Sequence, residues 1–236
     1  MRQIDAIHTL EDERFLVRMA RMSVAVLLAG VGFAILWFAV SNSPLPICPL
    51  ELNVALGPLG AAITGEPAAS GWSVAGWWFA LGAGCVVSFA AHELVHGFVF
   101  GRFMPAGHKV TYGGNLKKGI LYASAEGVLF TRDQYLLVAA APTIVITSLV
   151  AAAGWGFSWP LWTIAVASIH LSGCTGDWGY LRAILRNPDI AYCEDTAWGV
   201  AFYSDMPEQG VQRVRMNGFE VVEGGGLAGK GKEIHD

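Results

Sequence analysis

The stretch from Trp72 to Phe100 reads WSVAGWWFALGAGCVVSFAAHELVHGFVF, and Glu93 is its only formally charged residue. A helix rises ~1.5 Å per residue, so this stretch is long enough to cross the ~30 Å hydrocarbon core of a bilayer. The composition agrees, since 54% of the 236 residues are hydrophobic, 14% are charged and the mean hydropathy is +0.47. Soluble domains carry roughly 25% charged residues. The sequence therefore predicts an integral membrane protein.

Further apolar runs lie on both sides of this stretch. Residues 22–40 contain no charged residue, and neither do residues 134–176. The second run is interrupted at 154–160 by GWGFSWP, which is turn-forming and aromatic. It therefore predicts two spans, 134–153 and 160–182, in place of one.

These runs predict an all-α membrane protein. A four-helix transmembrane domain covers residues 22–186, between an N-terminal segment at 1–21 and a C-terminal tail at 187–236. The acidic residues of the N-terminal segment argue against a cleavable signal peptide. The tail has strand-like pieces at 199–203 and 219–222, and its Gly-rich, charged end predicts disorder.

The basic residues predict the orientation of the spans. All 15 Lys and Arg residues precede the first span, separate the second from the third, or lie at and after the end of the fourth. Segments 41–71 and 154–159 contain none. Because cytoplasmic loops collect Lys and Arg, the chain is predicted to be a multi-pass protein of the plasma membrane with both termini in the cytoplasm. The net charge of −4 argues against a nucleic-acid partner.

Residues 103–133, between the second and third spans, are too polar to cross a membrane and too long for a simple turn. Residues 108–112 and 120–130 are rich in β-forming side chains and flank Gly113-Gly114-Asn115. This pattern predicts a cytoplasmic β-hairpin inserted between the spans, with the glycines at its turn.

The sequence HELVH at 92–96 carries the chemistry. Two histidines four residues apart on a helix share one face, so both imidazoles can bind one metal ion, while Glu93 lies beside that ion. Neutral imidazole suits Zn²⁺. Polar residues inside a membrane span are costly and usually mark a functional site. The alternative is a polar cluster that joins helices without a metal.

A third ligand is predicted from depth in the membrane. The two histidines lie 20 and 24 residues after Trp72, or ~30 to 36 Å along the helix. Asp177 lies 17 residues after Pro160 in a parallel span, or ~26 Å, whereas His170 is only ~15 Å deep. Asp177 is therefore the predicted third ligand, and His170 is predicted to be too shallow. The alternative for Asp177 is an ion pair with Arg182.

This ligand set predicts an HExxH zinc metalloprotease with Glu93 as the catalytic base. Zinc lowers the pKa of a bound water to roughly 7, and a nearby carboxylate can move its proton to a leaving amine. The predicted substrate is a membrane-associated or transmembrane protein, cut near the cytoplasmic face. Asn115 and Tyr122 on the hairpin are candidates for substrate binding, with ordinary loop roles as the alternative. The alternative function is a non-catalytic zinc-binding scaffold or accessory protein in the lipid bilayer.

Several short motifs carry a family resemblance: HELVHG at 92–97, Tyr122-Ala123, Ala141-Pro142, Gly176-Asp177, Asn187-Pro188 and Asp195. Over roughly residues 85–203 the chain resembles the bacterial putative zincin peptidases of membranes, which are similar to site-2 proteases, the intramembrane zinc metalloproteases. The resemblance implies a bacterial protein with zinc bound by His92, His96 and Asp177, and with Glu93 as the base. Site-2 proteases usually carry Asn-Pro shortly before an Asp-Gly pair, whereas Trp178 follows Asp177 here.

Overall fold

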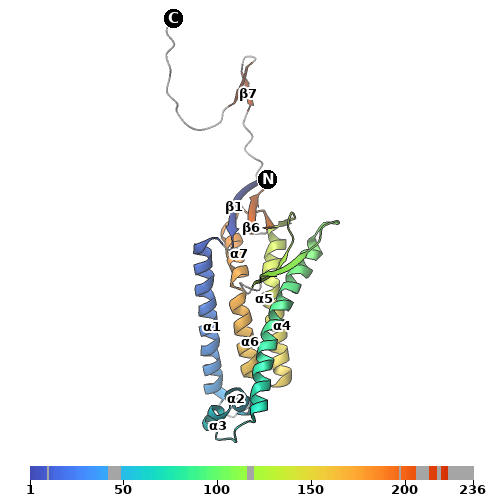
Figure 1. Cartoon of the computed structure of the whole chain (residues 1–236). Coiled ribbons are helices and arrows are strands. Elements are labelled where there is room, and N and C mark those ends of the chain that lie inside the picture. Colours follow the sequence, from blue (N-terminus) through green and yellow to red (C-terminus); the bar gives the residue numbers. More distant parts are fainter. Residues whose placement is uncertain are drawn as a thin grey trace.

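The computed structural model describes residues 1–9, 11–41, 49–115, 120–196, 198–205, 213–216 and 219–222. Its helices are α1 (Glu13–Ser41), α2 (Pro49–Leu56), α3 (Pro58–Thr64), α4 (Gly71–Phe103), α5 (Arg132–Phe157), α6 (Pro160–Gly173) and α7 (Thr175–Arg186). Its strands are β1 (Arg2–His8), β2 (Thr111–Asn115), β3 (Ile120–Ser124), β4 (Leu129–Thr131), β5 (Tyr192–Thr196), β6 (Gly199–Ser204), β7 (Arg213–Met216) and β8 (Phe219–Val222). The long helices form a bundle with strands at one end and α2 and α3 at the other (Figure 1).

Three of the described helices are long and apolar enough to cross a membrane, judged by length and composition. They are α1, α4 and α5, and they contain the predicted spans 22–40, 72–100 and 134–153. Many of their large apolar side chains face outward, so the interior of the bundle does not account for their hydrophobicity.

The predicted fourth span, 160–182, is wrong as one continuous helix, because it divides into α6 and α7 at Cys174. Neither part is among the helices long enough to span. Hydroxyl groups satisfy the backbone at the break. Ser23 on α1 and Thr175 both donate to the Ser172 carbonyl oxygen, at 2.7 and 3.1 Å. Such side-chain donors replace the helical partners that an interrupted helix lacks.

The prediction of an all-α chain is also corrected, because a four-stranded antiparallel sheet has the order β1-β6-β5-β4. Strand β1 pairs with β6 from Arg2 opposite Ser204 to His8 opposite Gly199. The predicted N-terminal segment and C-terminal tail therefore meet in one sheet. Its inner face buries the side chains of Phe130, Cys193, Val200 and Phe202. The predicted disordered end of the tail lies outside the described residues.

The predicted hairpin is present, with different boundaries. Strand β2 pairs with β3 from Thr111 opposite Ser124 to Asn115 opposite Ile120. Gly113, Gly114 and Asn115 therefore belong to β2 and not to its turn, and residues 116–119 between β2 and β3 lie outside the described residues. The predicted second strand, 120–130, divides at Gly127 (φ +75°), and its last part becomes β4 in the larger sheet.

A capping box fixes the start of α5. The Thr131 hydroxyl accepts the Gln134 backbone N–H at 3.4 Å, and the Gln134 side chain accepts the Thr131 N–H at 3.0 Å. The neighbouring Arg132 guanidinium donates to the carbonyl oxygens of Asn187 and Ile190, at 2.8 and 3.2 Å. These contacts join α5 to the chain that leaves α7.

At the opposite end of the bundle, the buried Glu51 carboxylate on α2 connects α4 and α6. It accepts the backbone N–H groups of Leu161 and Trp162 at 2.9 and 2.8 Å and the Trp77 indole N–H at 3.2 Å. The first N–H groups of a helix have no partner within it, and the helix dipole favours a negative charge there. Glu51 therefore caps α6 from another element.

Replacing Glu51 with alanine is expected to cost about 3 kcal/mol of stability, because it leaves buried N–H groups without an acceptor. Glu51→Gln keeps one acceptor oxygen and is expected to cost less. Thermal unfolding of the detergent-solubilised protein measures both effects. A Glu51→Ala protein that melts at the wild-type temperature would show that the cap is unimportant.

Candidate metal centre

The metal-binding histidines predicted from the sequence lie on one face of α4 and point into the bundle. His92 and His96 are 6% and 8% exposed, and their Nε2 atoms are 3.0 Å apart. One helical turn separates them, so the local helix alone brings the two imidazoles together.

Asp177, in the first turn of α7, completes a three-residue cluster. Its carboxylate oxygens lie 3.2 Å from Nε2 of His92 and 3.4 Å from Nε2 of His96. Ligands about 2.0–2.1 Å from a tetrahedral zinc ion are separated by ~3.3 Å, so the spacing of these three groups fits one ion. Two neutral nitrogen ligands and one carboxylate are also a ligand set that zinc accepts. Arg182, the alternative partner of Asp177, makes no ion pair with it in the described part of the chain.

The second ring nitrogen of His96 faces a carbonyl that α5 leaves free. Nδ1 of His96 lies 3.1 Å from the Val138 carbonyl oxygen. In a regular helix that oxygen accepts the N–H four residues later, but this position is Pro142, which has none. The proline therefore leaves the Val138 carbonyl oxygen available to the ring.

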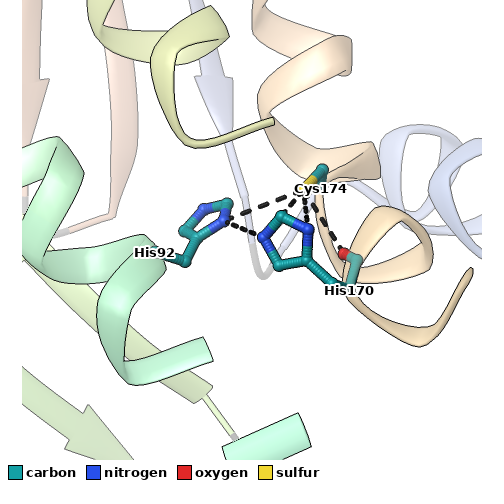
Figure 2. A group of neighbouring side chains, drawn as sticks. All are labelled: His92, His170 and Cys174. Atoms are coloured by element: carbon teal, nitrogen blue, oxygen red, sulfur yellow. Dashed lines mark hydrogen bonds between the residues drawn. The ribbon is translucent and has the colours of Figure 1, made fainter. Parts of the chain in front are cut away.

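The second ring nitrogen of His92 faces another histidine. Nδ1 of His92 lies 3.1 Å from Nε2 of His170, and Cys174 Sγ is 3.7 Å from each of these two nitrogens (Figure 2). His170 and Cys174 are fully buried. The three side chains form a second group with metal-ligand atoms close together, and it shares His92 with the first group.

The prediction that His170 is too shallow to reach this level is wrong. It assumed that Trp72 and Pro160 lie at equal depth, whereas Gly84 of α4 packs directly against the Trp162 ring. His92 is eight residues after Gly84, and His170 is eight residues after Trp162. Measured from this contact, α4 begins several turns farther back than α6 does. His92 and His170 therefore lie at the same level and meet.

Glu93 lies beside the three-residue cluster and outside it. It is half-buried, and the Ala123 backbone on β3 hydrogen-bonds to its carboxylate. Glu93 lines the same cavity of about 980 Å³ as His92, His96 and Asp177. This volume is within the usual range of ligand-binding pockets.

Residues 85–192 match a family model described as "Putative zincin peptidase". The matched region contains HELVH at 92–96, the hairpin and Asp177. No curated protein and no solved structure matched the chain. The match supports a zincin-like family and points to a zinc metallopeptidase.

The hairpin lies against α4 beside the cavity. Tyr122, a candidate for substrate binding, is half-exposed and lines the cavity. Asn115 ends β2, and its side chain lies outside the described residues, so this candidate stays a prediction. A Cβ atom at Gly97 would lie 1.9 Å from the Tyr112 hydroxyl oxygen, so the glycine of HELVHG allows the hairpin to approach α4.

Asp195, which carries part of the family resemblance, also lines the cavity. It lies within β5 and accepts the Ala125 backbone N–H and the Tyr135 hydroxyl, both at 3.2 Å. Burial raises the pKa of its carboxyl group, and these hydrogen bonds act in the opposite direction. Asp195 therefore joins β5 to α5 and to the turn after the hairpin.

Proposed function

We propose that this chain is an integral membrane zinc metallopeptidase that hydrolyses a peptide bond of a membrane-associated protein near the cytoplasmic face. The observation that carries the proposal is the convergence of His92, His96 and Asp177, at 3.0 to 3.4 Å from one another, next to Glu93. The match of residues 85–192 to the zincin-like family model supports the same chemistry.

Membrane insertion is supported by the outward apolar side chains of the long helices. Leu28 and Ile35 on α1, Val86 and Phe98 on α4 and Ile144 on α5 are each at least 65% exposed. An apolar surface of this extent is unfavourable in water and favourable against lipid. The Lys and Arg residues all lie at or beyond the ends of the predicted spans, on the side that the positive-inside rule makes cytoplasmic.

His92, His96 and Asp177 would bind zinc, and Glu93 would accept and donate the proton that moves during hydrolysis. Bound zinc supplies Lewis acidity, which polarises a carbonyl and acidifies water. Glu93 accepts a proton as a water oxygen bonds to the peptide carbonyl carbon, and it returns the proton to the nitrogen as the C–N bond breaks. A helical substrate must unwind first, because its carbonyl groups are already hydrogen-bonded.

Zinc removal tests this proposal. The purified protein is expected to contain one zinc ion per chain and to cut members of a peptide library reconstituted with it in vesicles. Treatment with a chelator should abolish the cleavage and lower the unfolding temperature, because a ligand that binds only the folded state stabilises it. Added zinc should restore both, with peptide products read by mass spectrometry.

Two results would contradict the proposal. Cleavage that continues after complete removal of the metal excludes a zinc mechanism. A protein that holds one zinc ion and cuts nothing in the library favours the non-catalytic zinc-binding scaffold.

A further inference from the structure

We propose that His170 and Pro142 are positioning residues, which fix the two metal-binding histidines in the tautomer that leaves Nε2 free for the ion. The proposal rests on the metal centre described above and concerns the atoms behind its ligands. Nε2 of His92 and of His96 faces Asp177, so each ring must carry its proton on Nδ1 when Nε2 binds a metal.

The tautomer of His96 is fixed by the backbone. Its Nδ1 lies 3.1 Å from the Val138 carbonyl oxygen, which can only accept a hydrogen bond. This oxygen is available because Pro142 has no N–H to offer it. A proline inside a helix costs stability because one helical hydrogen bond is lost. Here the carbonyl oxygen that lacks its helical partner can accept a hydrogen bond from a metal-binding ring.

The tautomer of His92 depends on a side chain. Nε2 of His170 lies 3.1 Å from Nδ1 of His92, and it must accept a hydrogen bond from the N–H at this position. The remaining proton of His170 is then on Nδ1, 3.9 Å from Cys174 Sγ, while the Cys174 thiol can donate to the His170 carbonyl oxygen at 3.3 Å. One consistent direction of hydrogen bonds therefore runs from His92 into α6.

The position of His170 is closely constrained, which suits such a role. Its ring is fully buried, and the Phe89 ring centre lies 6.1 Å away. A Cβ atom at Gly173 would meet the Phe89 ring, so the glycine favours the close approach of α6 to α4. A buried neutral imidazole without a partner would be unfavourable, and His92 supplies that partner.

The experiment measures Co²⁺ affinity and the visible spectrum of the metal-free full chain in detergent. His170→Leu removes the acceptor and is expected to weaken Co²⁺ binding by roughly 10–100-fold, the usual cost of losing a partner that orients a metal ligand. His170→Gln places an amide oxygen near the position of Nε2 and should restore most of the affinity. If the role of His170 were purely structural, the two variants would bind Co²⁺ with equal affinity whenever their metal-free proteins melt at similar temperatures.

Pro142→Ala provides an independent measurement. It restores an N–H that competes for the Val138 carbonyl oxygen, so Co²⁺ affinity should fall. The fall should be smaller than that of His170→Leu, since a carbonyl oxygen can accept two hydrogen bonds. The stability of the metal-free protein should change little, because the preference of a helix interior for alanine over proline is offset by the cavity left at this fully buried position. If the role of Pro142 were structural alone, a lower Co²⁺ affinity of Pro142→Ala would be accompanied by a lower stability of its metal-free protein.

Cys174→Ala tests whether the ion lies in the second group instead, and no sulfur-to-metal absorption band is expected in the wild type or in this variant. Wild-type affinity in His170→Leu would overturn the proposal. A sulfur-to-metal band that Cys174→Ala removes would also overturn it, because the ion would then lie between His92, His170 and Cys174. Failure of the wild type to bind Co²⁺ or Zn²⁺ would instead contradict the proposed function.

Discussion

Glu93→Gln is expected to reduce peptide cleavage by roughly 10²–10⁴-fold, the usual contribution of a positioned general base, and to leave zinc bound. Glutamine has nearly the shape of glutamate and cannot accept a proton at neutral pH. Glu93 is not one of the three residues, His92, His96 and Asp177, whose ligand atoms converge. The metal content should therefore stay near one ion per chain. The same preparation, analysed for metal and for cleavage, separates binding from catalysis.

Glu66→Gln is the matched control for this experiment. Glu66 is exposed and follows α3, at the end of the bundle opposite the sheet. The Glu66→Gln variant loses the same charge at a residue outside the cavity. Its cleavage rate should therefore equal that of the wild type. Cleavage by Glu93→Gln at more than a tenth of the wild-type rate would reject Glu93 as the base.

Asp177→Ala is expected to weaken zinc binding by more than the roughly 10–100-fold that follows loss of an orienting partner, because it removes a ligand itself. His92 and His96 alone leave two protein ligands, whereas catalytic zinc sites generally keep three. Cleavage should disappear together with the metal. Competition with a chromophoric chelator measures the affinity.

The control here is Asp189→Ala, an exposed carboxylate just after α7. It should retain the zinc affinity and the activity of the wild type. Unchanged zinc binding in Asp177→Ala would show that another residue supplies the third ligand, and His170 and Cys174 are the nearest alternatives.

The spacing of residues along the chain was sufficient to predict the features that lie within one helix. The interval between His92 and His96 corresponds to one turn wherever the helix lies, so their shared face could be predicted without any tertiary contact. The presence of three long apolar helices followed in the same way from hydrophobic run length, although each helix extends beyond its predicted span.

Features that depend on the offset between helices were predicted less well. The depth argument brought Asp177 to the histidines but placed His170 too far outward, because it took the starts of α4 and α6 as level. The contact between Gly84 and Trp162 sets the true offset, and it depends on side-chain packing between helices nearly 80 residues apart. The division of the predicted fourth span at Cys174 similarly needed Ser23 from α1.

The apolar character of the chain and the pairing of two imidazoles on one helical turn were predictable from the residues alone, because both follow from local composition and helical period. Packing between helices sets how Asp177, His170 and the Val138 carbonyl surround that pair, and strand pairing joins β1 to β6 across the length of the chain. These arrangements depend on packing and strand pairing between distant segments, and no local periodicity specifies them.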